Sequence, residues 1–361
     1  MYNNIHFVCC HPNVESWLTL YLQTESTSTK HHLWTQFISS GVFPNGAGPD
    51  VWVIRTFMHL RQRLPDLVTL GTDYREDVIN ITHPLCAPDR NQLSYRHFVV
   101  MACGEFIQAG CHERIVQNAL LERVGYGHYV PHWSQPGVIA RETVRKDTIN
   151  SVCFMGYSAE LHPYFRSQEF NEKLREIGVI FVEKEIADWN DYSDIDIVIA
   201  MRPSDGMRGS FEWQHRKPGS KLVNAWMAGV PAILSMEPAY VDIVNDKYDA
   251  RLISDPRDAV KAIQYLKENP AEYEQMRNRC SIRTEDYRDE AIENKWLQLI
   301  NGDIAVTYDK WRKSILYKLW SFVRLVIMYQ SIENIVKYQS NGKDDILYKA
   351  WKNICIRRQS I

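Results

Sequence analysis

The chain has 361 residues, 45% of them hydrophobic and 12% aromatic, which is enough apolar material for two cores of typical domain size. Its net charge of −2 conceals an asymmetry. From residue 310 onward, eleven lysines and arginines face three acidic residues, so this tail has an excess of eight positive charges and the preceding residues carry about ten negative ones. The opening Met1-Tyr2-Asn3-Asn4 leads into a short strand and lacks the pattern of a signal peptide.

The cysteine pattern excludes a disulfide framework. The eight cysteines, at positions 9, 10, 86, 103, 111, 153, 280 and 355, form no C-x-x-C pair and show no framework spacing. Several lie inside apolar runs, as at 7–10 and 152–154, where a reduced, buried thiol is the ordinary state. We therefore expect a cytoplasmic protein.

The first 118 residues alternate between short strands and helices. Helices are predicted at 14–23 and at 51–63, the second capped by Asp50. His11, Asp73 and Glu105 stand at strand ends, and open α/β sheets bind their ligands at the carboxyl ends of the strands. The strands themselves are predicted at 5–10, 67–70, 78–82, 97–103 and 113–118.

A break in periodicity at 128–137, with the sequence HYVPHWSQPG, predicts a linker between two domains. His128 and His132 lie four residues apart, but Pro131 argues against a helix that would aim both at one metal, so we expect no metal site there. The alternation then restarts, with strands at 149–155, 179–182 and 194–201 and helices at 167–178, 259–266, 271–279 and 285–299. The strand at 194–201 reads DIDIVIAM, is typical of a parallel sheet covered on both faces, and ends at Arg202.

The most informative stretch is 217–240, KPGSKLVNAWMAGVPAILSMEPAY. Pro218 suits a first helical turn, and Ser220 can cap the free amides there, beside Gly219. Lys217 and Lys221 lie one turn apart, so both ammonium groups can reach the same phosphate, with Asn224 on the adjoining stripe. A surface helix with two solvated lysines is the plain alternative.

This stretch resembles the nucleotide-sugar-binding segment of GT-B glycosyltransferases. The nearest group is the family 4-like one, which carries K-P-x-x-K-L-x-N-A-W-x-A-G-V-P-A-I followed by E-P-A. The matching positions are Lys217, Pro218, Lys221, Leu222, Asn224, Ala225, Trp226, Ala228, Gly229, Val230, Pro231 and 237–239. The resemblance covers residues 128–240 most strongly and the N-terminal half more faintly.

The resemblance implies an α/β fold of the GT-B class, with two Rossmann-like domains facing a cleft and a helical C-terminal tail. We assign residues 1–135 to an acceptor domain, 136–300 to a nucleotide-sugar domain and 301–361 to a basic amphipathic tail. The implied activity is transfer of a hexose-type sugar from a nucleotide-sugar donor to a glycan or lipid-linked acceptor, in surface polysaccharide or glycoconjugate synthesis. A sugar-nucleotide-binding or epimerase-like protein of the same fold, without transfer activity, is the alternative.

The family pattern also suggests roles for single residues. Arg202, Lys217, Lys221 and the amides of Gly219 and Ser220 would stabilise the departing phosphate, so that no metal cofactor is needed. Glu237 would lie near the ribose or the sugar, although the sequence is equally consistent with a solvated carboxylate in a loop. Gly46 and Gly48, in the glycine-rich loop at 41–50, would lie near acceptor and donor phosphates, although an ordinary strand-to-helix turn has the same composition.

One departure from the family pattern leaves the stereochemistry open. Many family 4 enzymes carry two glutamates seven residues apart around this helix, where the present chain has Arg216 or Lys217 and then Asn224. If the enzyme inverts, it needs a base, and His11, Asp73 or Glu105 could provide it. If it retains, none of the three need act.

The tail from residue 310 is predicted to be helical, and it is too short and too charged to span a bilayer. Either it packs on the catalytic domains, or it lies on an anionic membrane as a basic amphipathic helix. Its interleaved aliphatic residues argue against nucleic acid as the partner. The residues placed on one face are Trp311, Ile315, Leu319, Phe322 and Val326, with Arg312, Lys313, Lys318 and Arg324 between them.

Overall fold

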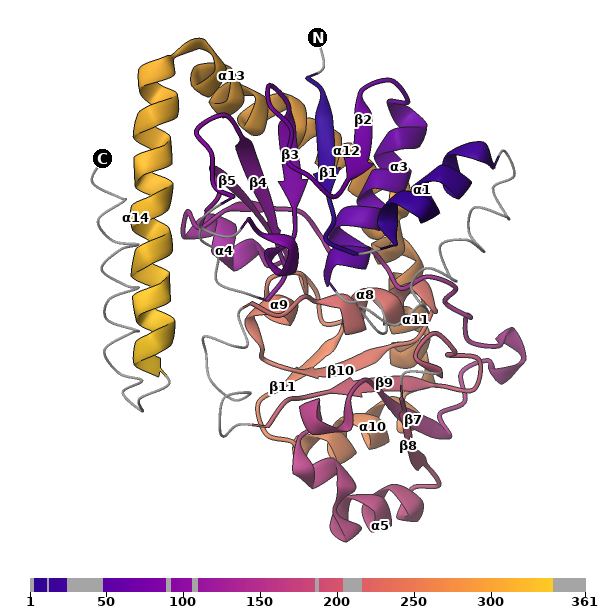
Figure 1. The fold of residues 1–361 in the computed structure, drawn as a ribbon. Helices are drawn as coiled ribbons and strands as arrows, with labels where there is room; N and C mark the ends of the chain where they lie inside the picture. The colour runs from indigo at the N-terminus through magenta and orange to yellow at the C-terminus, as the bar shows by residue number, and fades with distance from the viewer. Residues whose placement is uncertain are drawn as a thin grey trace. The chain divides into compact units, whose positions relative to one another are not determined.

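A computed structural model describes residues 3–11, 13–24, 48–88, 92–105, 110–185, 188–203 and 216–339 (Figure 1). The chain divides into two compact units. Unit 1 comprises Met1–Val116, Val124–His128 and Trp296–Ile361, and unit 2 comprises Gln117–Arg123 and Tyr129–Lys295. In this division, the residues from Trp296 onward belong to the same unit as the N-terminal residues.

Unit 1 is built on a six-stranded sheet in the order β2-β1-β3-β4-β5-β6, in which β1 to β5 run parallel. Its strands are β1 (Ile5–Val8), β2 (Val68–Gly71), β3 (Ile79–Thr82), β4 (Phe98–Cys103), β5 (Glu113–Val116) and β6 (His128–Tyr129). Every residue of β1 and β3 is buried, as a parallel strand covered on both faces requires. The helices are α1 (Val14–Gln23) and α3 (Thr56–Arg63), and α4 (Ala119–Arg123) follows in unit 2.

The helix before β2 differs from its prediction at the start. A π-helical turn, Asp50–Arg55, runs directly into α3, and the position before it is Pro49. The side chain of Asp50 is buried, and its carboxylate oxygens accept no hydrogen bond from any described residue. The predicted capping role of Asp50 is therefore wrong.

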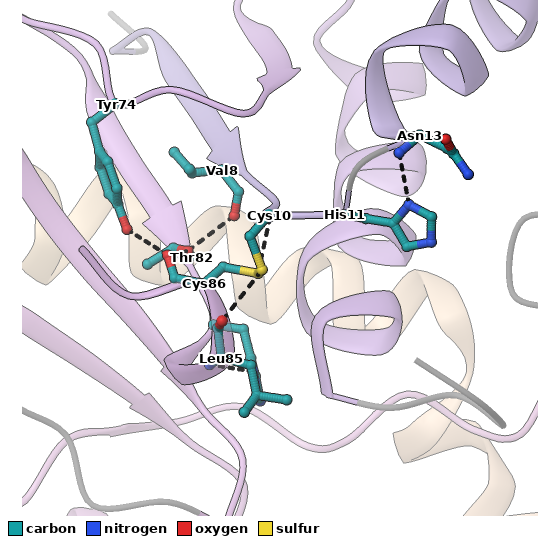
Figure 2. Close-up of a disulfide and its surroundings, with 9 residues drawn as sticks. Val8, Cys10, His11, Asn13, Tyr74, Thr82, Leu85 and Cys86 are labelled. Carbon is teal, nitrogen blue, oxygen red and sulfur yellow. Dashed lines mark hydrogen bonds between the residues drawn. A yellow bond between two sulfur atoms is a disulfide. The ribbon is translucent and has the colours of Figure 1, made fainter. Parts of the chain in front are cut away.

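A disulfide joins Cys10 to Cys86 at the carboxyl ends of two neighbouring strands (Figure 2). Cys10 follows β1, and Cys86 ends the short turn after β3; β1 and β3 pair directly, with Val8 opposite Thr82. The prediction of reduced cysteines is wrong for this pair, because sheet pairing and not sequence spacing brings the two together. Among the described residues, Cys9, Cys111, Cys153 and Cys280 are buried and form no disulfide. Since disulfides persist in oxidising compartments, the cysteines no longer support a cytoplasmic location.

Unit 2 is built on a second parallel sheet, in the order β11-β10-β9-β7-β8. The strands are β7 (Ser151–Met155), β8 (Ile180–Lys184), β9 (Ile197–Ala200), β10 (Ala232–Ser235) and β11 (Arg251–Ile253). The helices are α5 (Gln168–Glu176), α8 (Ser220–Met227), α9 (Pro238–Val241), α10 (Asp258–Glu268) and α11 (Pro270–Thr284), followed by α12 (Asp289–Leu299). The predicted fold class, two Rossmann-like α/β units with a helical C-terminal region, is confirmed.

The C-terminal region consists of two helices, α13 (Ala305–Lys313) and α14 (Ile315–Gln339). Helix α14 is yellow in Figure 1. Ser314 between them has extended backbone angles, so Trp311 and Ile315 do not share the single helical face that the pattern predicted. Trp311 is fully buried, with its ring centroid 5.6 Å from that of Phe98 on β4. The ammonium group of Lys318 lies 4.2 Å from the centroid of the Trp311 ring. One side of this region therefore packs on unit 1.

The opposite side of α14 is apolar and exposed. No helix among the described residues is long and apolar enough to cross a membrane. The large apolar side chains that are 43–76% exposed on α14 are Ile315, Leu316, Leu319, Trp320, Val323 and Ile327.

Candidate functional site

The strand order of unit 2 marks one edge of its sheet as a place for a ligand. After β7 the chain turns to β8 on one side, and after β8 it returns to place β9 on the other side of β7. In open parallel sheets, ligands bind beyond the carboxyl ends of the strands at such a switch point. The turn Ser158–Glu160 follows β7, and Arg202 follows β9. The segment leading into α8 contributes Lys217, and α8 itself contributes Lys221.

Three cationic side chains converge on the carboxylate of Glu160. The Lys217 ammonium donates to Oε1 at 3.0 Å, and the Lys221 ammonium donates to Oε2 at 3.4 Å. A guanidinium N–H of Arg202 also donates to Oε2, at 3.4 Å. We call these four residues, together with Glu237, the cation cluster. Lys217 and Lys221 thus contact the same carboxylate, although Lys217 lies before α8 and not one helical turn from Lys221, and they are not solvated surface lysines.

Arg202 is held by a second carboxylate, that of Glu237 after β10. Glu237 accepts hydrogen bonds from the Arg202 guanidinium, from the Arg202 backbone N–H at 3.3 Å and from the Ser235 hydroxyl at 2.6 Å. It is 3% exposed, so it is not the solvated carboxylate that the sequence also allowed. The Nε atom of Arg202 is buried and has no hydrogen-bond partner within the described ranges.

The charges in the cation cluster are strongly coupled. Burial raises the pKa of Glu160, but the charges of Lys221, Arg202 and Lys217 outweigh burial and bring this pKa down to about 2. Burial, together with the Arg202 charge, lowers the pKa of Lys221. With Glu160 ionised, three cations face two carboxylates, which leaves one net positive charge in a largely buried site.

Gly156, directly after β7, leaves the space that the Lys221 side chain needs. Its φ of +151° is a backbone conformation that favours glycine. A Cβ atom there would lie 2.9 Å from Lys221 Cε and 3.1 Å from Phe154 Cζ. The Lys221 ammonium lies 5.5 Å from the centroid of the Phe154 ring, so the glycine turn and this ring together position the cation.

The start of α8 differs from its prediction. The helix begins at Ser220, Gly219 occupies the capping position, and no side chain caps the helix, so the predicted capping role of Ser220 is wrong. Gly219 and Ser220 line a hollow that Asp242 and Tyr287 also line. The lysines of the cation cluster do not line this hollow.

Asn224 is engaged with the segment that was predicted as a linker. Its side-chain oxygen accepts from the Gln135 backbone N–H at 2.9 Å, and its amide group donates to the Gln135 side chain at 3.2 Å. Two other amide side chains hold the backbone that leads into α8. Gln117 donates to the Arg216 carbonyl at 3.0 Å, and Asn118 donates to the Lys217 carbonyl at 3.3 Å.

The candidate residues of the N-terminal half follow parallel strands of unit 1 and so stand along one edge of its sheet. Asp73 is exposed and Glu105 is partly buried. His11 is buried, and burial lowers the pKa of its imidazole. Its Nδ1 accepts the Asn13 backbone N–H at 3.1 Å (Figure 2). With this hydrogen bond, a neutral His11 carries its proton on Nε2.

The glycine loop is described only in part. Gly46 lies outside the described residues. A Cβ atom at Gly48 would come within 2.0 Å of His83 Nε2, so Gly48 leaves room for this imidazole. Burial lowers the pKa of His83 to about 3, so the ring is neutral at physiological pH.

Two acidic residues have an importance that the sequence did not predict: Asp50, for which it predicted only a capping role, and Glu160, for which it predicted none. Burial raises the pKa of Asp50 to about 7, and its carboxylate oxygens have no hydrogen-bond partner in the part of the chain that the structure describes. Glu160 was missed because its only sequence signal is its place in the turn after a strand. Its role depends on cations that are 42 to 61 positions away in the chain.

Within the described ranges, no three His, Cys, Asp or Glu side chains are grouped so that they could hold a metal ion. His128 pairs with Glu113, with 3.2 Å between Nε2 and Oε2. His132 Nδ1 lies 2.6 Å from the Trp133 carbonyl oxygen.

No family model matches the chain, and no curated protein matches it. Among solved structures, it is similar to AviGT4, described as a glycosyltransferase involved in avilamycin A biosynthesis, with 14% identity, a TM-score of 0.45 and coverage of 83% of this chain and 98% of that one. HepE from Anabaena, in complex with UDP and glucose, shows 11% identity and a TM-score of 0.46, over 83% of this chain and 100% of that one. TarM shows 13% identity and a TM-score of 0.45, over 68% of this chain and only 58% of TarM. At these identities and scores, nothing about individual residues follows.

Proposed function

We propose that the cation cluster binds the diphosphate of a nucleotide-sugar and that the protein is a glycosyltransferase. One observation carries the proposal: three cationic side chains meet at a single anion position, beyond the strand ends at the switch point of unit 2. The segment that contains Lys217 and Lys221 is also the one that resembles the nucleotide-sugar-binding segment of GT-B glycosyltransferases. We propose a glycan or glycolipid acceptor, in surface polysaccharide or glycoconjugate synthesis.

The chemistry of sugar transfer explains why such a cluster is useful. When the bond between the sugar and the diphosphate breaks, negative charge develops on the departing phosphate, and fixed cations that surround it lower the barrier. A hydrogen bond from a charged group contributes about 1.5 to 3 kcal/mol, which corresponds to roughly one to two decades in rate. We propose that Arg202, Lys217 and Lys221 take the role that a metal ion has in other transferases. If the reaction inverts, His11, Asp73 and Glu105 are the candidates for the base that takes the proton of the acceptor.

A screen of nucleotide-sugars by thermal shift, followed by a hydrolysis assay of each binder, tests the proposed function. We expect at least one nucleotide-sugar to raise the melting temperature and to be hydrolysed slowly, and we expect this hydrolysis to survive excess chelator. Hydrolysis that is lost with chelator and restored by Mg²⁺ or Mn²⁺ would contradict the metal-independent mechanism. Binding without turnover in the presence of varied acceptors would favour the alternative, a binding or epimerase-like protein.

We further propose that α14 attaches the protein to an anionic membrane through its exposed apolar side. Trp320 and its apolar neighbours provide the surface that enters the headgroup region, and exposed basic residues at Arg312 and Lys313 lie just before it. Attraction to anionic lipid is worth about 1 kcal/mol per nearby basic residue and weakens with salt. Packing on unit 1 through Trp311 is compatible with this attachment, because Trp311 lies on the buried side.

We expect the protein to sediment with anionic vesicles at low salt and not with neutral ones. The double variant Leu316→Glu, Trp320→Glu should lose this binding while its melting temperature stays within a few degrees of the wild-type value, because both side chains are exposed. Ile282→Glu, at a 58% exposed position on α11, is the matched control and should still bind. Truncation of the chain after Asp309 would not test the role of α14 alone, because it also removes the buried Trp311. Equal sedimentation of the double variant and the wild type would exclude α14 as the membrane surface.

A further inference from the structure

We infer that Glu160 is an affinity-determining residue whose carboxylate occupies the position of a donor phosphate group and must leave for a diphosphate to bind. This inference rests on the proposed function of the cation cluster and adds to it an internal competitor. Glu160 accepts its hydrogen bonds from Arg202, Lys217 and Lys221, the same groups proposed to bind phosphate.

The two carboxylates of the cation cluster are held very differently. Glu237 is 3% exposed and is fixed by a backbone N–H, by the Ser235 hydroxyl and by Arg202. Within the described ranges, Glu160 accepts hydrogen bonds only from the three cationic side chains. Its side chain is 14% exposed, against 5% for Arg202 and 6% for Lys217. Glu160 is therefore the member that can leave without breaking bonds to the backbone.

The balance of charges in the cation cluster also indicates that Glu160 leaves when a diphosphate binds. With Glu160 in place, the cation cluster has one net positive charge. The diphosphate of a nucleotide-sugar, which is esterified at both ends, brings about two negative charges, one for each phosphate. Binding beside Glu160 would therefore leave an excess of negative charge and place like charges within a few ångströms of each other. Without Glu160, three cations face only Glu237, and two net positive charges match the ligand.

The location of Glu160 allows this movement. It ends the short turn Ser158–Glu160 after β7, and it belongs to no long helix or strand. Lys221 and Arg202 are held more firmly, since the Lys221 side chain lies beside Gly156 and the ring of Phe154, and Arg202 is also bound by Glu237. When an anion enters, the turn that carries Glu160 can therefore move while the cationic side chains keep their positions.

Binding of inorganic pyrophosphate to the full-length protein, measured by calorimetry at fixed ionic strength, tests this inference without knowledge of the nucleotide base. We expect Glu160→Gln, which keeps the size of the side chain and removes its charge, to bind pyrophosphate about tenfold more tightly than the wild type, or better. Glu169→Gln removes the same charge from the surface of α5, where Glu169 pairs with Lys173, and should leave the affinity unchanged.

A second variant protects the test against a folding defect. Glu160→Asp keeps the charge but shortens the side chain by one methylene, about 1.5 Å, which draws the carboxylate away from the cations. It should also bind pyrophosphate more tightly than the wild type. Melting curves of the ligand-free proteins show which variants are folded.

The outcomes separate the inference from the proposed function. If the wild type binds pyrophosphate and both Glu160 variants bind it equally or more weakly, Glu160 is a supporting member of the site and the inference is wrong, while the proposed function stands. If nucleotide-sugars bind but pyrophosphate binds to none of the proteins, the inference is also wrong. Failure of both ligands with all the proteins would overturn the inference and the proposed function together.

Discussion

Lys217→Met is expected to weaken the binding of a nucleoside diphosphate by at least tenfold, because it removes one of the three cations that meet at the anion position. Methionine keeps most of the volume of the lysine stem, so the packing around a side chain that is 6% exposed is largely preserved. The melting temperature of the ligand-free protein should change little, since Glu160 keeps two cationic partners. Calorimetric titration with UDP and other nucleoside diphosphates measures the effect.

The matched control is Lys173→Met, which removes an exposed lysine of α5 that pairs with Glu169. It should bind nucleoside diphosphates as the wild type does, because surface ion pairs contribute little and lie outside the proposed site. Equal affinity of Lys217→Met and the wild type would remove Lys217 from the phosphate site.

Asp196→Asn is expected to lower the free energy of unfolding by about 3 to 5 kcal/mol, because it leaves buried cations without their counter-charge. Asp196 is fully buried just before β9 and forms ion pairs with Arg141 at 2.8 Å and Arg145 at 2.7 Å. It also accepts the backbone N–H groups of Asn150 and Ser151 at 2.8 and 3.0 Å. Chemical denaturation of both proteins measures the difference.

The control lies two residues away. Asp194 is 61% exposed and pairs with Lys184, so Asp194→Asn should cost less than about 1 kcal/mol. Similar losses for both variants would contradict the expectation that the buried ion pairs of Asp196 contribute far more stability than the exposed pair of Asp194.

The pH dependence of the Asp196 effect follows from the direction of its pKa shift. Burial raises the pKa of this carboxyl, but the hydrogen bond from Arg145, that from the Asn150 amide and the charge of Arg141 together lower it below its ordinary value. A lowered folded-state pKa contributes stability above the unfolded-state pKa of about 3.9 and loses it as the pH falls toward the folded-state value. The difference between wild type and Asp196→Asn should therefore be constant near neutral pH and shrink below about pH 4.

The sequence predicted helices and strands well where a single local signal, such as apolar periodicity, determined them. The helix at 14–23 was predicted with the bounds that α1 has, and the parallel strands followed from short apolar runs between turns. Lys217 and Lys221 both contact the Glu160 carboxylate, but Lys217 lies before the first turn of α8, so the helical spacing assumed for this pair does not apply. The strand predicted from 194 begins at Ile197, because Asp196 uses its carboxylate to fix the arginines and amides around it.

The features that escaped prediction depend on pairing between distant segments. Cys10 and Cys86 meet because β1 and β3 are neighbours in the sheet, which the separation of 76 residues does not reveal. Glu160 is functional in this account only because Arg202 and the lysines approach it from other strands and helices. The break at Ser314 could not be read from apolar periodicity, since apolar residues continue on both sides of it.

A crystal structure of the protein in complex with a nucleoside diphosphate would show directly where the phosphates bind. We expect phosphate oxygens within hydrogen-bonding distance of Lys217, Lys221 and Arg202, at the position that the Glu160 carboxylate occupies without ligand, with Glu160 turned away. Phosphates bound elsewhere, for example in the hollow lined by Gly219, Ser220 and Asp242, with Glu160 still held by its three cations, would contradict this expectation.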